Sequence, residues 1–214
     1  MKRLAKLIMS TTSALTGVFV LTGTAGVKVL TETSPPAPPD LLSNAGFENP
    51  VMEVRSEEAM HPDSWLTFTG GTSELMFLTT AGARSGNQAV KFVSHGVPNF
   101  YQGLVQALPV TPGERYQFSA YVKVDPTHPL KGSVTGQLSI EWHGATGNEI
   151  GRLWSKVWNA SFASSDWTKF EVAGVVPPNA ARAHFVMVEK GESQPVAGCV
   201  FFVDDASVVK VTEQ

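Results

Sequence analysis

The chain of 214 residues has little charge and almost no cysteine, and each shortage excludes a class of protein. Only 16% of its residues are charged and its net charge is −3, whereas nucleic-acid-binding surfaces are usually strongly basic. We therefore expect no nucleic-acid partner. Its single cysteine, Cys199, excludes an internal disulfide and a zinc site built from cysteines. Because Cys199 lies in an apolar stretch, we expect it to be a small buried side chain.

Motifs that mark catalysis are also absent from the sequence. It contains no G-x-S-x-G nucleophile turn, no H-E-x-x-H zinc motif and no glycine-rich loop leading into a helix. The five histidines are scattered without the spacing of metal ligands. No pattern places a second carboxylate on the same face as Glu141, as a pair of glycosidase acids would require. The sequence therefore predicts a protein that is not an enzyme.

The first 40 residues have the layout of an export signal followed by a spacer. A short basic head precedes an uncharged run over residues 7–27, and small residues surround Ala25. This layout predicts a signal peptide over residues 1–25. The alternative is an uncleaved membrane anchor that reaches to about residue 30, because the uncharged run is long enough to span a bilayer. Prolines crowd the end of residues 26–40, which predicts a semi-rigid linker.

Either form of the amino terminus predicts an exported protein that is secreted, periplasmic or at the cell surface. Membrane attachment follows only if the amino-terminal segment stays uncleaved.

Residues 41–214 have the pattern of a single all-β domain. Turn residues recur at short intervals between stretches that alternate between apolar and polar side chains. The clearest alternation runs over residues 116–124, where one face is apolar and the other carries polar side chains, as in a strand buried on one side. The pattern predicts a β-sandwich of the jelly-roll type.

Candidate ligand-binding side chains lie on the polar faces of two predicted strands. Tyr121 falls on the polar face of residues 116–124, and Glu141 and His143 fall on that of residues 136–143. Trp142 falls on the apolar face and is predicted to be in the core. An exposed tyrosine can stack against the C–H bonds of a sugar ring, whereas Glu141 and His143 can hydrogen-bond to hydroxyls. The alternatives are a tyrosine packed on a neighbouring long side chain, and polar groups that are only hydrated.

Two further candidates, Trp154 and Trp158, lie in a segment without clean alternation, which indicates a strand end and a loop. Exposed tryptophans at the edge of a groove would suit saccharide stacking, because aromatic side chains concentrate at recognition sites. We expect at least one of the two to be exposed. The alternative is that one of them closes the end of the sandwich.

The two ends of the domain each combine apolar residues with carboxylates. The opening LLSNAGFE covers residues 41–48, and FFVDDASVV covers residues 201–209. Gly46 is expected to take the positive φ of a turn, so that Phe47 points into the core and Glu48 away from it. Two such ends can pair and hold a hard cation between them. The alternative is that the acids are solvated loop ends.

Together these stretches resemble the carbohydrate-binding modules grouped as families four, nine and twenty-two. The resemblance covers roughly residues 41–211, in the order of the family's motifs. Besides the two ends, three internal segments are similar to family motifs: ARSGNQAVK at 83–91, VTPGERYQFSAYVK at 110–123 and DWTKF at 166–170. The resemblance implies a galactose-binding-like jelly roll that binds a polysaccharide or other glycan without catalysis. On that basis the glycan-binding candidates are Tyr121, Glu141, His143, Trp154 and Trp158.

The resemblance also implies a structural Ca²⁺ ion. The matching ligands are Glu48 and Asp204, with Asp205 as an alternative and backbone carbonyls near residues 85–87 as further donors.

Two other functions are compatible with the same frame. A structural or adhesive cell-surface sandwich without a sugar site predicts that Tyr121, Trp154 and Trp158 are all buried or far apart. A small jelly-roll polysaccharide lyase or hydrolase predicts a tight cleft with at least two titratable groups of perturbed pKa. Modules of the family usually accompany a catalytic domain, and this chain shows none, which weakens the case for targeting polysaccharide degradation.

Overall fold

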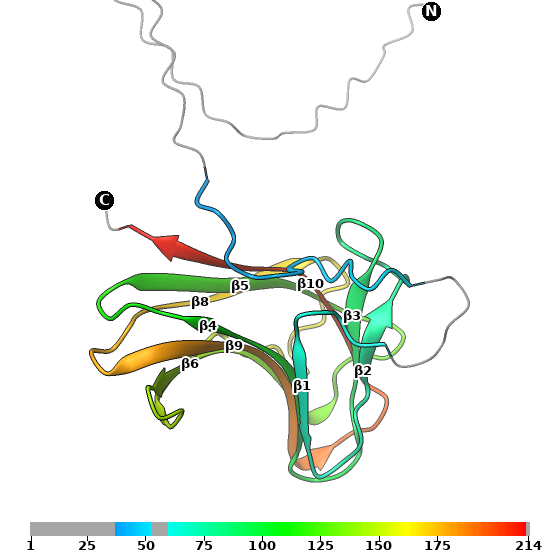
Figure 1. Cartoon of the computed structure of the whole chain (residues 1–214). Helices are drawn as coiled ribbons and strands as arrows, with labels where there is room; N and C mark the ends of the chain where they lie inside the picture. Colours follow the sequence, from blue (N-terminus) through cyan, green and yellow to red (C-terminus); the bar gives the residue numbers. More distant parts are fainter. Residues whose placement is uncertain (1–36, 53–59, 213–214) are drawn as a thin grey trace, which may run out of the picture. The chain divides into compact units, whose positions relative to one another are not determined.

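The computed structural model describes residues 37–52 and 60–212, which form an antiparallel sandwich of two sheets (Figure 1). The predicted signal peptide or anchor and most of the predicted linker lie outside these residues. Sheet A has the strand order β1 (Leu66–Gly70), β4 (Phe100–Pro109), β9 (Ala180–Pro195), β6 (Gly132–Gly144) and β7 (Glu149–Trp154). Sheet B has the order β2 (Met76–Thr79), β3 (Ala89–Val93), β10 (Val200–Val211), β5 (Arg115–Val124) and β8 (Thr168–Val175).

The all-β sandwich predicted from the sequence is therefore confirmed. Within the described residues, no helix is long and apolar enough to cross a membrane.

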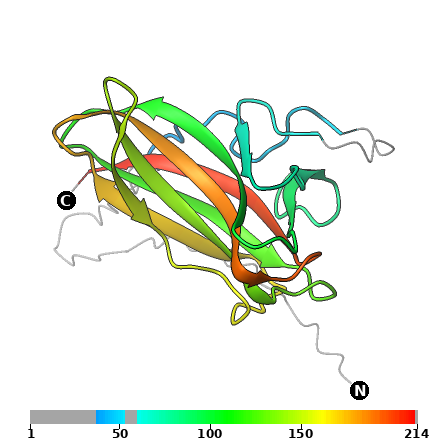
Figure 2. The ribbon, with the colours of Figure 1, turned by 90° about the horizontal axis from the view of Figure 1, so that it is seen from below.

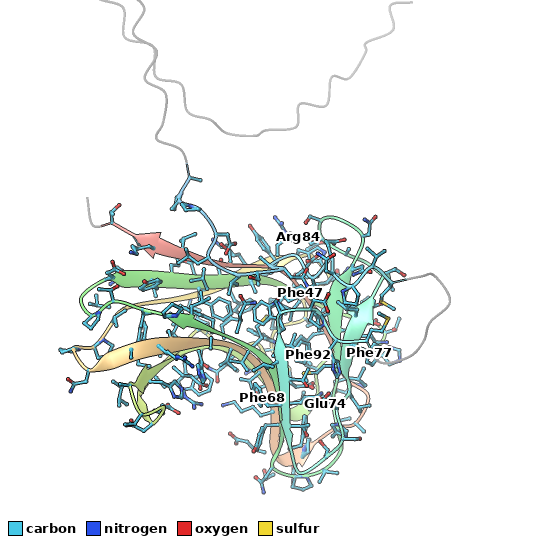
Figure 3. The ribbon with its side chains drawn as sticks, in the orientation of Figure 1. Phe47, Phe68, Glu74, Phe77, Arg84 and Phe92 are labelled. Carbon is cyan, nitrogen blue, oxygen red and sulfur yellow. The ribbon has the colours of Figure 1, made fainter. Side chains whose placement is uncertain are left out.

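The core lies between the sheets and follows the alternation of the strands. The apolar face of β6 is buried as predicted, including Trp142, and Cys199 is buried beside β10. Phe92 of β3 and Phe201 of β10 stack with their ring centroids 4.7 Å apart. Figure 3 shows Phe47 and Phe92 among the side chains that fill this space. Burial of these aromatic side chains, together with the aliphatic residues around them, stabilises the sandwich.

The two ends of the domain lie side by side, as their sequences predict. The backbone N–H of Leu41 donates to the carbonyl of Val208, and the N–H of Ala206 donates to the carbonyl of Ala45. Phe47 is fully buried, as expected. The expected turn geometry is wrong in one detail, because the positive φ angles belong to Asn44 and Phe47 and not to Gly46.

Asn44 has a structural role at this turn. Its side-chain amide donates to the carbonyls of Asn49 and Asp63, and its side-chain oxygen accepts from the N–H of Asn49. Asparagine tolerates positive φ better than most residues, so these bonds hold the turn without a glycine.

One carboxyl group lies inside the core. Glu189 of β9 is fully buried, and one of its oxygens accepts a hydrogen bond of 2.6 Å from the Gln102 side chain of β4. Gln102 also donates to the carbonyl of Val93 and accepts from the N–H of Leu75, so it links the two sheets. Burial raises the pKa of Glu189 to about 8, against the smaller opposing effect of the bond from Gln102.

We expect the stability of the fold to fall as pH rises through neutrality. The unfolded chain releases the Glu189 proton near the usual pKa of 4.5, whereas the folded chain holds it until about pH 8. The folded state binds more protons in between, so the free energy of unfolding decreases with pH up to that value. Glu189→Gln should remove this decrease between pH 6 and pH 8, measured by urea denaturation. Glu171 is exposed, so Glu171→Gln should leave the decrease of the unfolding free energy with pH unchanged. If Glu189→Gln also left this decrease unchanged, its assignment to Glu189 would be contradicted.

Candidate functional site

The pairing of β9 with its two neighbours arranges side chains in rows on the outer face of sheet A. Val186 of β9 lies opposite Val105 of β4 and Ser139 of β6. One row further, Val188 lies opposite Gly103 and Gln137. Because side chains of paired residues point to the same face, these rows form a continuous surface across the sheet. Figure 2, seen from below, shows this sheet in front of sheet B.

A groove of about 560 Å³ opens on this outer face. Valine side chains from β4 and β9 form its floor. One side is bordered by aromatic residues of β1 and β4, and the other by residues of β7. The lining consists of Phe68, Tyr101, Val105, Glu141, Arg152, Trp154, His184, Val186, Val188 and Lys190.

Two glycines hold the aromatic rings of the first wall close to the sheet. A Cβ atom added to Gly103 would lie 2.4 Å from the ring of Phe68, and one added to Gly70 would lie 2.1 Å from that of Tyr101. Each ring therefore covers the space that a side chain would otherwise occupy. Tyr101 is still 47% exposed, so part of its ring faces solvent. Figure 3 labels Phe68 beside β1.

The opposite wall carries Trp154, which is 41% exposed. The ammonium nitrogen of Lys190 lies 4.4 Å from the centroid of the indole ring, and the guanidinium carbon of Arg152 lies 5.1 Å from it. Cations at these distances are attracted to the face of an aromatic ring. The two contacts hold the indole in place at the side of the groove.

Charged groups and two histidines gather at one end of the groove. Arg152 makes two hydrogen bonds of 2.9 and 2.6 Å to Glu149 and a contact of 3.2 Å to Glu141. Burial raises the pKa of Glu141, and the nearby charge of Arg152 opposes that rise. The rings of His143 and His184 stack with their centroids 3.9 Å apart. Burial and the neighbouring His143 lower the pKa of His184.

The structure brings three of the five glycan-binding candidates to this face. Glu141 and Trp154 line the groove, and His143 lies next to Glu141, with 3.8 Å between its Nε2 atom and a carboxylate oxygen.

The prediction that Trp158 lies at the edge of a groove is wrong. The side chain is fully buried, with its ring 4.8 Å from that of Phe170 and 5.7 Å from that of Phe201. Backbone bonds to Gly136 hold the segment against β6, and a Cβ atom at Gly136 would lie 2.1 Å from the indole nitrogen. The missing side chain of Gly136 thus makes room for Trp158 between the sheets. The alternative in which one tryptophan closes the sandwich is the correct one.

Tyr121 lies on the other sheet and cannot share a groove with Trp154. It belongs to β5, opposite Asp204 of β10 and Lys169 of β8. The guanidinium of Arg84 lies 3.4 Å above the centre of its ring. Figure 3 shows Arg84 on the side of the sandwich away from Phe68. The alternative of a tyrosine packed on a neighbouring long side chain is therefore the correct one.

Sequence reasoning missed the aromatic wall made by Phe68 and Tyr101. The signal for Tyr101 was present, because Phe100, Gln102 and Leu104 alternate as one face and leave Tyr101 on the other. Phe68 alternates in the same way within β1, in the row opposite Gly103.

The acids at the two ends of the domain meet around the loop of residues 84–88. Glu48 accepts hydrogen bonds from the backbone N–H groups of Asn87 and Gln88. Asp204 is fully buried and accepts from the N–H groups of Arg84 and Ser85.

Asp205 bonds instead to the side chains of Arg84 and Ser85. Burial raises the pKa of Asp204 to about 6, although backbone hydrogen bonds oppose the rise. The loop is thus clamped between Glu48 on one side and Asp204 on the other.

Comparison with known proteins identifies the family. A family profile described as a carbohydrate binding domain, of the group four and nine, matches residues 39–194. The chain belongs to this family. Its members are non-catalytic binding domains, so residues 39–194 form a carbohydrate-binding module. A search of curated protein sequences finds no match.

Solved structures agree on the fold. The module TmCBM61, in complex with β-1,4-galactotriose, has a TM-score of 0.52 and 19% identity over 81% of this chain and 99% of its own. The CBM22-1 and GH10 modules of xylanase 10B from Clostridium thermocellum, complexed with xylohexaose, have a TM-score of 0.51 and 16% identity over 70% of this chain and 26% of their own.

Tailspike protein 4 of bacteriophage CBA120 has a TM-score of 0.56 and 15% identity over 80% of this chain. The module spans about a fifth of the tailspike chain (21%). At such low identities the likeness of these structures shows the fold alone.

The different surroundings of the two tryptophans predict different effects on stability. Trp158→Ala should lower the free energy of unfolding by about 3–5 kcal/mol, because it opens a cavity between the sheets. Trp154→Ala should change it by less than about 1 kcal/mol, because much of that ring faces solvent. Urea denaturation of the two variants measures both values. Equal losses in the two variants would contradict the burial of Trp158.

Proposed function

We propose that the groove on the outer face of sheet A binds the glycan. The observation that carries this proposal is the pair of exposed rings, Tyr101 and Trp154, on opposite walls of one groove. Exposed aromatic side chains are costly to leave in water without a partner and are common at recognition sites. A sugar ring presents flat faces of C–H bonds that match such side chains.

Polar groups along the groove suit the hydroxyls of a sugar. Lys190 and Arg152 donate hydrogen bonds, whereas the Glu141 carboxylate accepts them. Because Arg152 is already held by Glu149 and Glu141, it is oriented before ligand arrives. A few polar groups placed among apolar ones is the usual composition of a small-ligand site.

The ligand class that we propose is a β-1,4-linked polysaccharide. One protein that shares this fold over nearly its whole length was solved with β-1,4-galactotriose, and a xylanase that shares it over about a quarter (26%) of its length was solved with xylohexaose. The valine floor and paired aromatic walls favour a ligand with apolar ring faces over a highly charged one.

The alternative of a structural or adhesive protein without a sugar site predicts that Tyr121, Trp154 and Trp158 are all buried or far apart. The structure meets that condition, because Trp158 is buried and Tyr121 lies on the other sheet from Trp154. What disfavours the alternative is a residue outside those three, Tyr101, which faces Trp154 across the groove.

Affinity electrophoresis and a glycan array on the full chain test the groove. The native chain should bind a β-1,4-galactan or a xylan, and Tyr101→Ala and Trp154→Ala should each weaken binding by about 30-fold, the effect of losing about 2 kcal/mol at a central contact. Tyr121→Ala is the matched control, because it removes an aromatic ring from the opposite sheet and should leave binding unchanged.

Loss of binding in Tyr121→Ala but not in Trp154→Ala would move the site to sheet B. No binding by a folded native chain to any glycan would overturn the proposal.

We further propose a structural calcium ion at the clamp between the two ends of the domain. Glu48 and Asp204 supply hard carboxylate oxygens on either side of one loop, which suits Ca²⁺. Asp204 is buried with a raised pKa, and a bound cation would favour its charged form. Asp205 is engaged by Arg84 and Ser85, so we assign the primary roles to Glu48 and Asp204. The ion would tie the first segment to β10 without contacting the glycan.

Removal of calcium tests this site. EDTA should lower the melting temperature of the native chain by about 5–10 °C, because an ion bound only to the folded state adds about 3 kcal/mol at 100 times its Kd. Glu48→Gln and Asp204→Asn should abolish the response to calcium, whereas Glu171→Gln on the outside of β8 should retain it. A melting temperature that is unaffected by EDTA and by added calcium in the native chain would rule out the ion.

Export is the remaining part of the proposal. It is supported by the basic head and uncharged run of residues 1–27 and by the proline-rich residues that follow. A binding module for polysaccharides also works where polysaccharides are, which is outside the cell or on its surface. Membrane attachment would require that the amino-terminal segment stays uncleaved.

A further inference from the structure

Three potential metal ligands converge at one end of the groove. Glu141 and His143 are two residues apart on β6 and therefore share its outer face. His184 of β9 lies directly opposite Glu141 in the pairing of the two strands. One ligand atom from each side chain lies within 4.8 Å of the other two. Among the described residues, this is the one group of three such side chains.

The structure defines which nitrogen of His143 is available. Its Nδ1 atom lies 3.0 Å from the carbonyl oxygen of Gly147, and a carbonyl can only accept a hydrogen bond. Nδ1 therefore carries the proton, and Nε2 of the neutral ring presents a lone pair. That Nε2 atom is buried and has no hydrogen-bond partner in the structure. A histidine fixed through one nitrogen to a carbonyl, with the other nitrogen free, has the arrangement typical of metal ligands.

We propose that Glu141, His143 and His184 bind a divalent transition-metal ion of the zinc type. Two imidazoles and a carboxylate favour zinc and its neighbours over calcium or magnesium, which prefer oxygen ligands alone. Zinc bonds of about 2.0–2.1 Å in tetrahedral geometry place ligand atoms about 3.3 Å apart. The Nε2 atom of His143 and the nearer oxygen of Glu141 are already 3.8 Å apart, so this pair needs to close by about half an ångström.

The charges around the three ligands permit such an ion. Arg152 contacts Glu141 and opposes a second cation there, but it is held more closely by its two hydrogen bonds to Glu149. Glu141 can therefore turn to the ion while Arg152 remains on Glu149. Glu149 also interacts electrostatically with both histidines and adds a negative charge nearby. Arg182 of β9 lies opposite His143 of β6, and its positive charge would also repel the ion.

The site lies at one end of the glycan groove, but the proposal does not depend on glycan binding. Glu141 and His184 both line the groove, so an ion held there would face its open volume. Three protein ligands leave a tetrahedral ion with one open position, which a water molecule or a sugar hydroxyl can occupy. The ion would then add a Lewis-acidic contact at one end of the binding surface. This assignment goes beyond the calcium proposed at Glu48 and Asp204, on different residues and with different ligand chemistry.

Calorimetric titration of the full chain with zinc chloride tests the site. Calcium is kept in excess, so that oxygen-only sites are occupied. The native chain should bind one zinc ion, and His143→Phe and His184→Phe should each weaken binding at least about 100-fold, because each removes a direct ligand and keeps a ring for stacking. His128→Phe is the matched control, because His128 lies on an exposed turn beside Asp125 and should not affect zinc binding.

A second measurement does not depend on the folding of any variant. Zinc should protect His143 and His184 of the native chain from chemical modification by diethyl pyrocarbonate, with His128 modified equally in both states. The proposal would be overturned if the native chain did not bind zinc, or if the two ligand variants bound zinc as tightly as the native chain does. It would also be overturned if zinc gave no protection to the two histidines. Zinc binding without glycan binding would leave this site in place and count against the proposed groove.

Discussion

The register of β9 between β4 and β6 is the constraint on which both the core and the groove depend. Opposed residues share a face, so the same pairing that buries Phe185 and Met187 sets Val186 and Val188 on the outside. A slip of one residue would exchange the two sets, placing His184 between the sheets and Phe185 in water. Burial of the aromatic core therefore fixes the positions of the groove residues, although none of them contributes to that core.

Polar groups inside the sandwich show how closely the two sheets are joined. Gln102 connects β4 to the segment before β2, to β3 and to Glu189, using both ends of one amide. Gln106 does the same for the amino-terminal stretch, since it bonds to both the N–H and the carbonyl of Ser43. Buried amides satisfied in this way cost little and select one arrangement of the backbone. Both glutamines belong to β4, the strand that also carries Tyr101 at one side of the groove.

The sequence was sufficient for the fold, for the burial of Trp142 and for one exposed tryptophan, but it did not tell which of Trp154 and Trp158 would be exposed. Trp142 lies in a strand of strict alternation, so its burial could be inferred from its neighbours. Trp158 follows the last residue of β7, where alternation has ended, and its burial depends on the space left by Gly136 in a strand 22 residues earlier. Tyr121 obeys its alternation and still fails as a ligand platform, because the pattern shows a face but not which sheet or which neighbour covers it.

The residues that carry the family resemblance lie apart from the groove, which explains why the family could be recognised from the sequence while the groove was predicted only in part. The residues that carry the resemblance, such as Asn44, Gly86 and Asp204, lie where the ends of the domain meet around one loop. Their identities are restricted by positive φ angles, by close approach and by buried hydrogen bonds. Groove residues such as Tyr101 and Trp154 face solvent at alternate positions of β4 and β7, where the fold accepts many side chains. Such positions can change with the ligand, so only the three-dimensional pairing of the strands reveals which of them act together.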